Sequence, residues 1–109
     1  MSDFDISVIT TFHNAGDTLR EAIESVLQEN VLRIQLILVD DGSDDGSCQI
    51  AGDYVGENVV LFSPGRIGRA AALNVGLRGA KSDIIAILDA DDRCLASRLR
   101  DQCDYLAQN

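Results

Sequence analysis

Basic residues are scarce in this chain. It carries 9 Lys and Arg against 18 Asp and Glu, which gives a net charge of −9. A surface this acidic repels phosphate backbones and anionic lipid, so the charge argues against nucleic-acid binding and peripheral membrane attachment. Proline occurs once and aromatic residues make up 5%, whereas 46% of the residues are hydrophobic. This composition argues against a disordered tract and favours a packed core.

Cysteine motifs, targeting segments and long apolar runs are also missing. The three cysteines form no C-x-x-C pair and leave one over, which favours free thiols in a reducing compartment: Cys48, Cys94 and Cys103. No basic region precedes an apolar stretch at the N-terminus, as a secretory signal would require. No apolar run is long enough to cross a bilayer. We expect a cytoplasmic protein, at the inner membrane face if a longer protein carries this domain.

Short apolar segments alternate with helical patterns along the chain. The length of 109 residues favours a single domain that comprises residues 1–109. We expect strands at 6–11, 35–39, 59–62 and 84–88. Helical patterns follow each strand, and Thr18 with Glu21 has the spacing of a capping box. The alternation predicts a doubly wound α/β fold, with a mainly parallel sheet in the order 3-2-1-4 and helices on both faces.

Polar residues follow three of these strands, where ligands bind in such sheets. The segments are 10–14, 40–43 and 89–92, and two of them are rich in carboxylates: Asp40, Asp41, Asp89, Asp91 and Asp92. Two carboxylates about 4 Å apart repel by roughly 4 kcal/mol at an effective dielectric of about 20. A bound Mg²⁺ or Mn²⁺ would offset this repulsion and bridge a diphosphate. Aspartates can instead form turns and helix caps, as we expect of Asp44 and Asp45.

Five ordered segments resemble family 2 glycosyltransferases: 7–14, 22–28, 38–43, 70–77 and 87–92. The resemblance covers nearly the whole chain. It implies a GT-A-type fold, a nucleotide-sugar donor with UDP-sugar favoured, and inverting transfer to a saccharide or lipid-linked acceptor. It also implies a divalent metal, Mn²⁺ or Mg²⁺, held by the carboxylates that follow the fourth strand.

The resemblance further implies roles for individual residues. Thr11, His13 and Asn14 lie on the nucleotide side of the site, and Asp41 matches the carboxylate that accepts from a uracil-type base. Arg69 matches a basic residue that faces the diphosphate. The metal ligands implied by the Asp-x-Asp pattern are Asp89 and Asp91, with Asp92 as a third acceptor, and Asp89 also counts among the nucleotide-binding residues.

No residue matches the family's general base, which lies well downstream of the Asp-x-Asp pattern. Inverting transfer needs such a base to deprotonate the acceptor hydroxyl. We therefore expect a donor-binding part, truncated before the acceptor-binding half and inactive alone. Two copies of the chain could pair through the exposed edge of the fourth strand, so a homodimer is a further expectation.

Two other classes compete with this interpretation. The run 65–69 resembles a dinucleotide-binding loop of oxidoreductases, although it lacks the first glycine and follows the third strand. A receiver-like or other non-catalytic binding module is the second alternative. A receiver would need its acidic pair after the first strand, whereas Asp40 and Asp41 follow the second.

Overall fold

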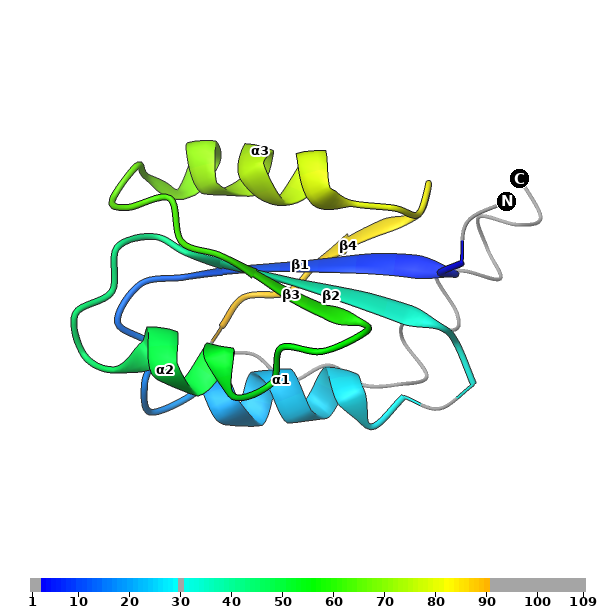
Figure 1. Cartoon of the computed structure of the whole chain (residues 1–109), viewed down its shortest axis with the longest axis horizontal. Helices are drawn as coiled ribbons and strands as arrows, with labels where there is room; N and C mark the ends of the chain where they lie inside the picture. Colours follow the sequence, from blue (N-terminus) through cyan, green and yellow to red (C-terminus); the bar gives the residue numbers. More distant parts are fainter. Residues whose placement is uncertain (1–2, 30, 91–109) are drawn as a thin grey trace.

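The computed structural model describes residues 3–29 and 31–90, which form a parallel four-stranded sheet (Figure 1). The spatial order is β3-β2-β1-β4, which confirms the doubly wound α/β prediction. The strands are β1 (Ile6–Phe12), β2 (Ile34–Asp40), β3 (Val59–Phe62) and β4 (Ile85–Ile87). β1 pairs with both β2 and β4, so Ile9 lies between Ile37 and Ile87. The carboxyl ends of β1, β2 and β4 therefore share one edge of the sheet.

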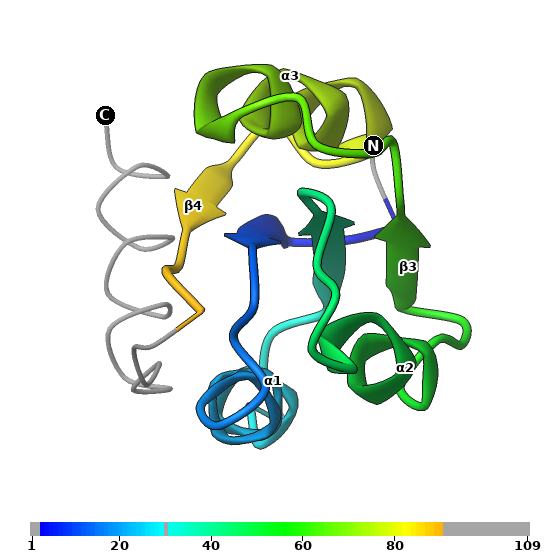
Figure 2. The same cartoon turned by 90° about the vertical axis from the view of Figure 1, so that its left-hand side faces the viewer.

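Helices cover both faces of the sheet (Figure 2). Helices α1 (Leu19–Leu27) and α2 (Ser47–Gly52) lie on one face, and α3 (Arg69–Gly79) lies on the other. The predicted capping box is wrong, because Thr18 makes no side-chain hydrogen bond at the start of α1. Its backbone, at φ −120° and ψ −18°, lies outside the extended conformation that a capping side chain requires. Among the described residues, no helix has the length and apolar character needed to cross a membrane.

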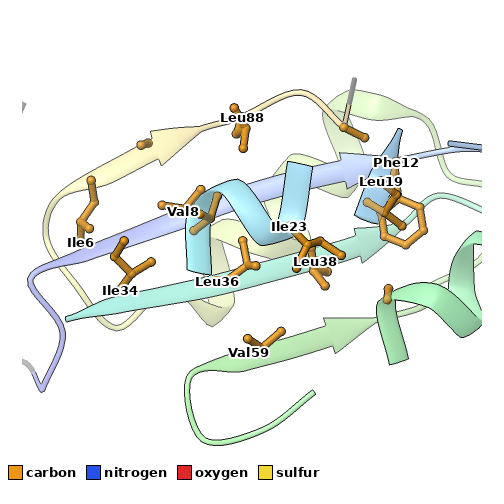
Figure 3. Close-up of a cluster of buried hydrophobic side chains, with 14 residues drawn as sticks. Ile6, Val8, Phe12, Leu19, Ile23, Ile34, Leu36, Leu38, Val59 and Leu88 are labelled. Carbon is orange, nitrogen blue, oxygen red and sulfur yellow. The ribbon is translucent and has the colours of Figure 1, made fainter. Parts of the chain in front are cut away.

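Helices on both faces bury β2 at every position, so the core has two layers. Side chains of β1 and β2 that point one way, such as Val8 and Leu36, meet Ile23 of α1 (Figure 3). Those that point the other way, Ile9 and Ile37 among them, pack beneath α3. The continuous apolar pattern of β2 is typical of a parallel strand covered on both faces. A ligand can therefore reach β2 only at its ends.

One polar side chain interrupts the apolar pattern of β2. Gln35 is 5% exposed, and its amide donates to the backbone oxygen of Gly79 at 3.0 Å. Its carbonyl oxygen accepts from Ser7 Oγ at 2.6 Å and from the backbone N–H of Lys81 at 2.8 Å. Because a buried polar group must be paired, this network fixes the link from α3 to β4. It therefore sets where β4 begins.

Gly76 lets α3 approach the sheet closely. A Cβ at this position would lie 2.6 Å from Ile9 Cγ2, well inside contact distance. We expect Gly76→Ala to lower the free energy of unfolding by about 1–3 kcal/mol through overpacking. Gly52→Ala in α2 is the matched control, because nothing lies within 4 Å of its added Cβ. Urea unfolding should show a loss only for Gly76→Ala, and equal stabilities would contradict this account of the packing.

Candidate functional site

A hollow of about 220 Å³ lies where the carboxyl ends of the strands meet. It is lined by residues that follow or end β1, β2, β3 and β4: Thr11, Phe12, His13, Asp41, Arg66, Arg69 and Asp89. All of the predicted nucleotide-binding residues except Asn14 are among them. A larger hollow of about 490 Å³ is lined by Gln35, Asn58 and Lys81 near the opposite end of the sheet. It contains none of the predicted residues.

Asp41 is the most enclosed carboxylate of the hollow. It directly follows β2, its backbone N–H donates to the oxygen of Phe12 at 2.8 Å, and its side chain is 6% exposed. Oδ1 accepts from the backbone N–H groups of Ile67 at 2.7 Å and Gly68 at 2.9 Å. Oδ2 accepts from Arg66 Nη1 at 3.0 Å. A carboxylate has roughly four acceptor positions, so Oδ2 retains one for a further donor.

The hydrogen bonds to Asp41 keep it ionised. Burial by itself raises the pKa of this carboxyl, but the N–H groups of Ile67 and Gly68 and the charge of Arg66 outweigh it. The net effect holds the Asp41 pKa below its ordinary value. Near neutral pH the side chain is thus a negatively charged acceptor and cannot donate.

Gly42 lets the loop 63–68 approach the end of β2. Its φ is +74°, a conformation that glycine adopts without strain. A Cβ there would lie 2.8 Å from Arg66 Cβ and 2.9 Å from its Cα. Gly42 therefore has a packing role as well as a turn conformation, and it keeps Arg66 beside Asp41. Arg66 also donates to the Asp41 backbone oxygen at 3.2 Å, although its side chain is 61% exposed.

Asn14, which the sequence placed among the nucleotide-binding residues, does not line the hollow. Its φ is +52°, and its side chain turns to the loop that follows β2. The backbone N–H of Asn14 donates to Ser43 Oγ at 2.9 Å, and its Oδ1 accepts from the backbone N–H of Asp44 at 2.8 Å. Asn14 therefore joins two loops, whereas its neighbour His13 lines the hollow.

Arg69 and Asp89 face each other at the rim of the hollow. Arg69 Nη2 lies 3.1 Å from Asp89 Oδ1, and their side chains are 63% and 56% exposed. An ion pair this exposed contributes only about 0–1 kcal/mol, so it can separate at little cost. Helix α3 begins at Arg69, and the first N–H groups of a helix attract anions. The rim thus offers a cation, a helix N-terminus and a carboxylate that can each take another partner.

The carboxylate cluster is smaller than the sequence suggested. Asp40 is buried, and its Oδ1 accepts from the backbone N–H of Ser43 at 2.9 Å, so it forms a turn. Asp45 accepts from Gly16 and Ser47, which confirms its expected turn role. Asp91 and Asp92 lie outside the described residues. Within 3–29 and 31–90, no three His, Cys, Asp or Glu side chains are grouped closely enough to hold a metal ion.

Two residues of the hollow had no firm role from sequence. Phe12 ends β1, is 3% exposed and belongs to the core, and it also lines the hollow. Arg66 lies in the run 65–69, for which the sequence suggested only a resemblance to a dinucleotide-binding loop. Its position three residues before Arg69 in a loop with two glycines was the available signal. Neither this spacing nor the two glycines show that the loop folds back onto the end of β2.

Comparisons with known proteins agree with this architecture. The family model described as glycosyl transferase family 2 matches residues 7–109. An uncharacterized glycosyltransferase of Haemophilus influenzae is 37% identical over 107 residues, which are 95% of this chain and 43% of that protein. The chain thus spans less than half of this relative.

Solved structures show the same fold. Residues 1–349 of S. aureus TarS in complex with UDP-GlcNAc superpose with a TM-score of 0.86 at 23% identity, over 94% of this chain and 31% of that one. The mannosyltransferase PcManGT of Pyrobaculum calidifontis, in complex with GDP-Man and Mn²⁺, gives a TM-score of 0.70 at 26% identity. That match covers 81% of this chain and 28% of the other. With a GT-A arrangement and a family match over 7–109, the chain belongs to glycosyl transferase family 2.

Proposed function

We propose that this chain binds the nucleoside-diphosphate part of a sugar donor in the hollow at the carboxyl ends of its strands. The observation that carries the proposal is the convergence of Asp41, Arg69 and Asp89 on one hollow from three separate segments. Asp41 would accept a hydrogen bond from the base. Arg69 and the N-terminus of α3 would attract the negatively charged diphosphate, and Asp89 would bind a metal ion. The nucleotide-sugar complex of PcManGT supports the same class of ligand.

Asp41 and Arg66 together favour one kind of base edge. The free acceptor position of Asp41 Oδ2 lies beside a guanidinium that has N–H donors to spare. An acceptor next to a donor matches the N3–H and carbonyl of uracil, and also the N1–H and O6 of guanine. Cytosine and adenine present the reverse, an acceptor nitrogen beside an amino group. The hollow is small, which favours the single ring of uracil.

Asp89 is the described residue that fits a divalent metal. Its carboxylate is more than half exposed and lies two residues after the end of β4, and hard cations such as Mg²⁺ and Mn²⁺ prefer carboxylate oxygens. Asp91 and Asp92 would complete the ligand set. When bound, the metal would neutralise the developing charge on the diphosphate leaving group. Arg69, paired with Asp89 otherwise, would then be free to bind the diphosphate.

The donor side alone does not complete an inverting transfer. The reaction also needs a general base that takes the proton of the acceptor hydroxyl. The described carboxylates of the hollow are Asp41 and Asp89, and both have roles toward the donor. We therefore propose that the chain binds the donor but transfers sugar only when further residues supply the base and the acceptor site. We propose a saccharide or a lipid-linked alcohol as the class of acceptor.

Base selectivity and metal dependence test this function together. Calorimetric titration with UDP, GDP, CDP and ADP, each with Mn²⁺ or with chelator, separates the two. We expect UDP to bind at least about ten-fold more tightly than CDP or ADP, because a mismatched base leaves Asp41 without its donor. Chelator should weaken UDP binding about ten-fold or more. Equal affinity for the four nucleotides, or no change with chelator, would contradict the proposal.

A further inference from the structure

The His13 ring is held by the protein at both nitrogens. Nδ1 lies 2.9 Å from the backbone oxygen of Asp41, and Nε2 lies 3.3 Å from Asn14 Nδ2. A carbonyl oxygen can only accept, so Nδ1 carries the hydrogen. In the neutral imidazole, Nε2 is then an acceptor, which suits the amide N–H₂ of Asn14.

The orientation of the Asn14 amide is determined by a second contact. Its Oδ1 accepts from the backbone N–H of Asp44 at 2.8 Å, so its N–H₂ group must face His13. The left-handed backbone of Asn14 is held by its N–H bond to Ser43 Oγ. Turning the amide over would set two donors against each other at the Asp44 N–H and two acceptors against each other at His13 Nε2.

We infer that Asn14 is a positioning residue, which holds His13 as a fixed wall of the hollow in its Nδ1–H tautomer. With both ring nitrogens engaged, His13 offers a bound nucleotide its ring surface and no N–H group. Asn14 acts through His13 and does not itself touch the ligand. This role rests on the proposed nucleotide site for its effect on binding, but the tautomer does not depend on that proposal.

The tautomer can be measured directly, because His13 is the single histidine of the chain. Long-range ¹H–¹⁵N spectra of the ligand-free protein should show a protonated Nδ1 and an unprotonated Nε2. In Asn14→Asp, the new carboxylate keeps an acceptor for Asp44 N–H but can no longer donate to the ring. We expect Nε2 to carry a hydrogen in this variant and to donate it to the carboxylate. An Nε2–H tautomer in the unmodified protein, or an unchanged ring in Asn14→Asp, would overturn the inference.

Nucleotide affinity tests the consequence for the site. Asn14→Gly keeps the positive φ available and removes only the side chain. We expect it to weaken UDP binding by roughly three- to ten-fold, since one hydrogen bond contributes about 0.5–1.5 kcal/mol. Asn58→Gly is the control, at an exposed asparagine near the opposite end of the sheet. Equal UDP affinities for the two variants would overturn the positioning role. Failure of the unmodified protein to bind any nucleotide would instead overturn the proposed function and leave the tautomer test standing.

Discussion

Asp41→Asn is expected to weaken UDP binding by about ten- to a hundred-fold, since hydrogen bonds to charged groups contribute about 1.5–3 kcal/mol. The amide oxygen can keep the N–H bonds of Ile67 and Gly68 that Oδ1 now accepts. The amide nitrogen would then stand at the Oδ2 position, facing Arg66 Nη1 and the base N–H with donors of its own. Binding of the base should therefore be lost while the loop stays in place.

The same variant separates the base from the diphosphate. Binding of Mn²⁺-pyrophosphate should stay within about two-fold of the unmodified protein, because Asp41 is assigned no contact with phosphate or metal. Asp44→Asn is the control, with the same charge change at an exposed position of the same loop. Calorimetric titrations with UDP and with pyrophosphate at fixed Mn²⁺ give both affinities. If Asp41→Asn lowers the two by the same factor, Asp41 belongs to the metal site.

Asp89→Asn is expected to remove most of the gain in UDP affinity that Mn²⁺ provides, a loss of about ten- to a hundred-fold at saturating metal. The carboxylate is the hard ligand that follows β4, and an amide is a far weaker one for such a cation. In the presence of chelator, the variant and the unmodified protein should bind UDP about equally. Asp91→Ala is expected to have the same effect, as the second ligand of the Asp-x-Asp pattern.

Asp83→Asn provides the matched control for the metal assignment. Asp83 is exposed and precedes β4, whereas Asp89 follows it, so the two substitutions remove the same charge at opposite ends of one strand. A purely electrostatic effect of net charge would appear in both variants. Metal ligation predicts loss only in Asp89→Asn. Equal changes in Mn²⁺-dependent affinity would show that Asp89 does not hold the ion.

The family resemblance added roles that the hollow makes possible but does not test. Thr11, His13, Asp41, Arg69 and Asp89 line it. Asn14 does not, because a positive φ directs its side chain toward the loop after β2. The side chains of adjacent residues in a sequence motif can thus point in different directions, and the backbone conformation at a single position decides between them.

The sequence by itself determined the alternation of strands and helices, the order of the sheet and the edge at which we expect a ligand to bind. These follow from local patterns: apolar runs such as 35–39 predict buried strands, and right-handed crossovers leave few ways to order them. Only the tertiary structure decided how the loops at the two ends of the sheet pair. Asp41 with the loop at Arg66, Gln35 with the loop at Lys81, and Asn14 with Asp44 are joined by hydrogen bonds across 25, 46 and 30 positions. Such contacts have no periodicity, because they form only after strands far apart in the chain have packed side by side.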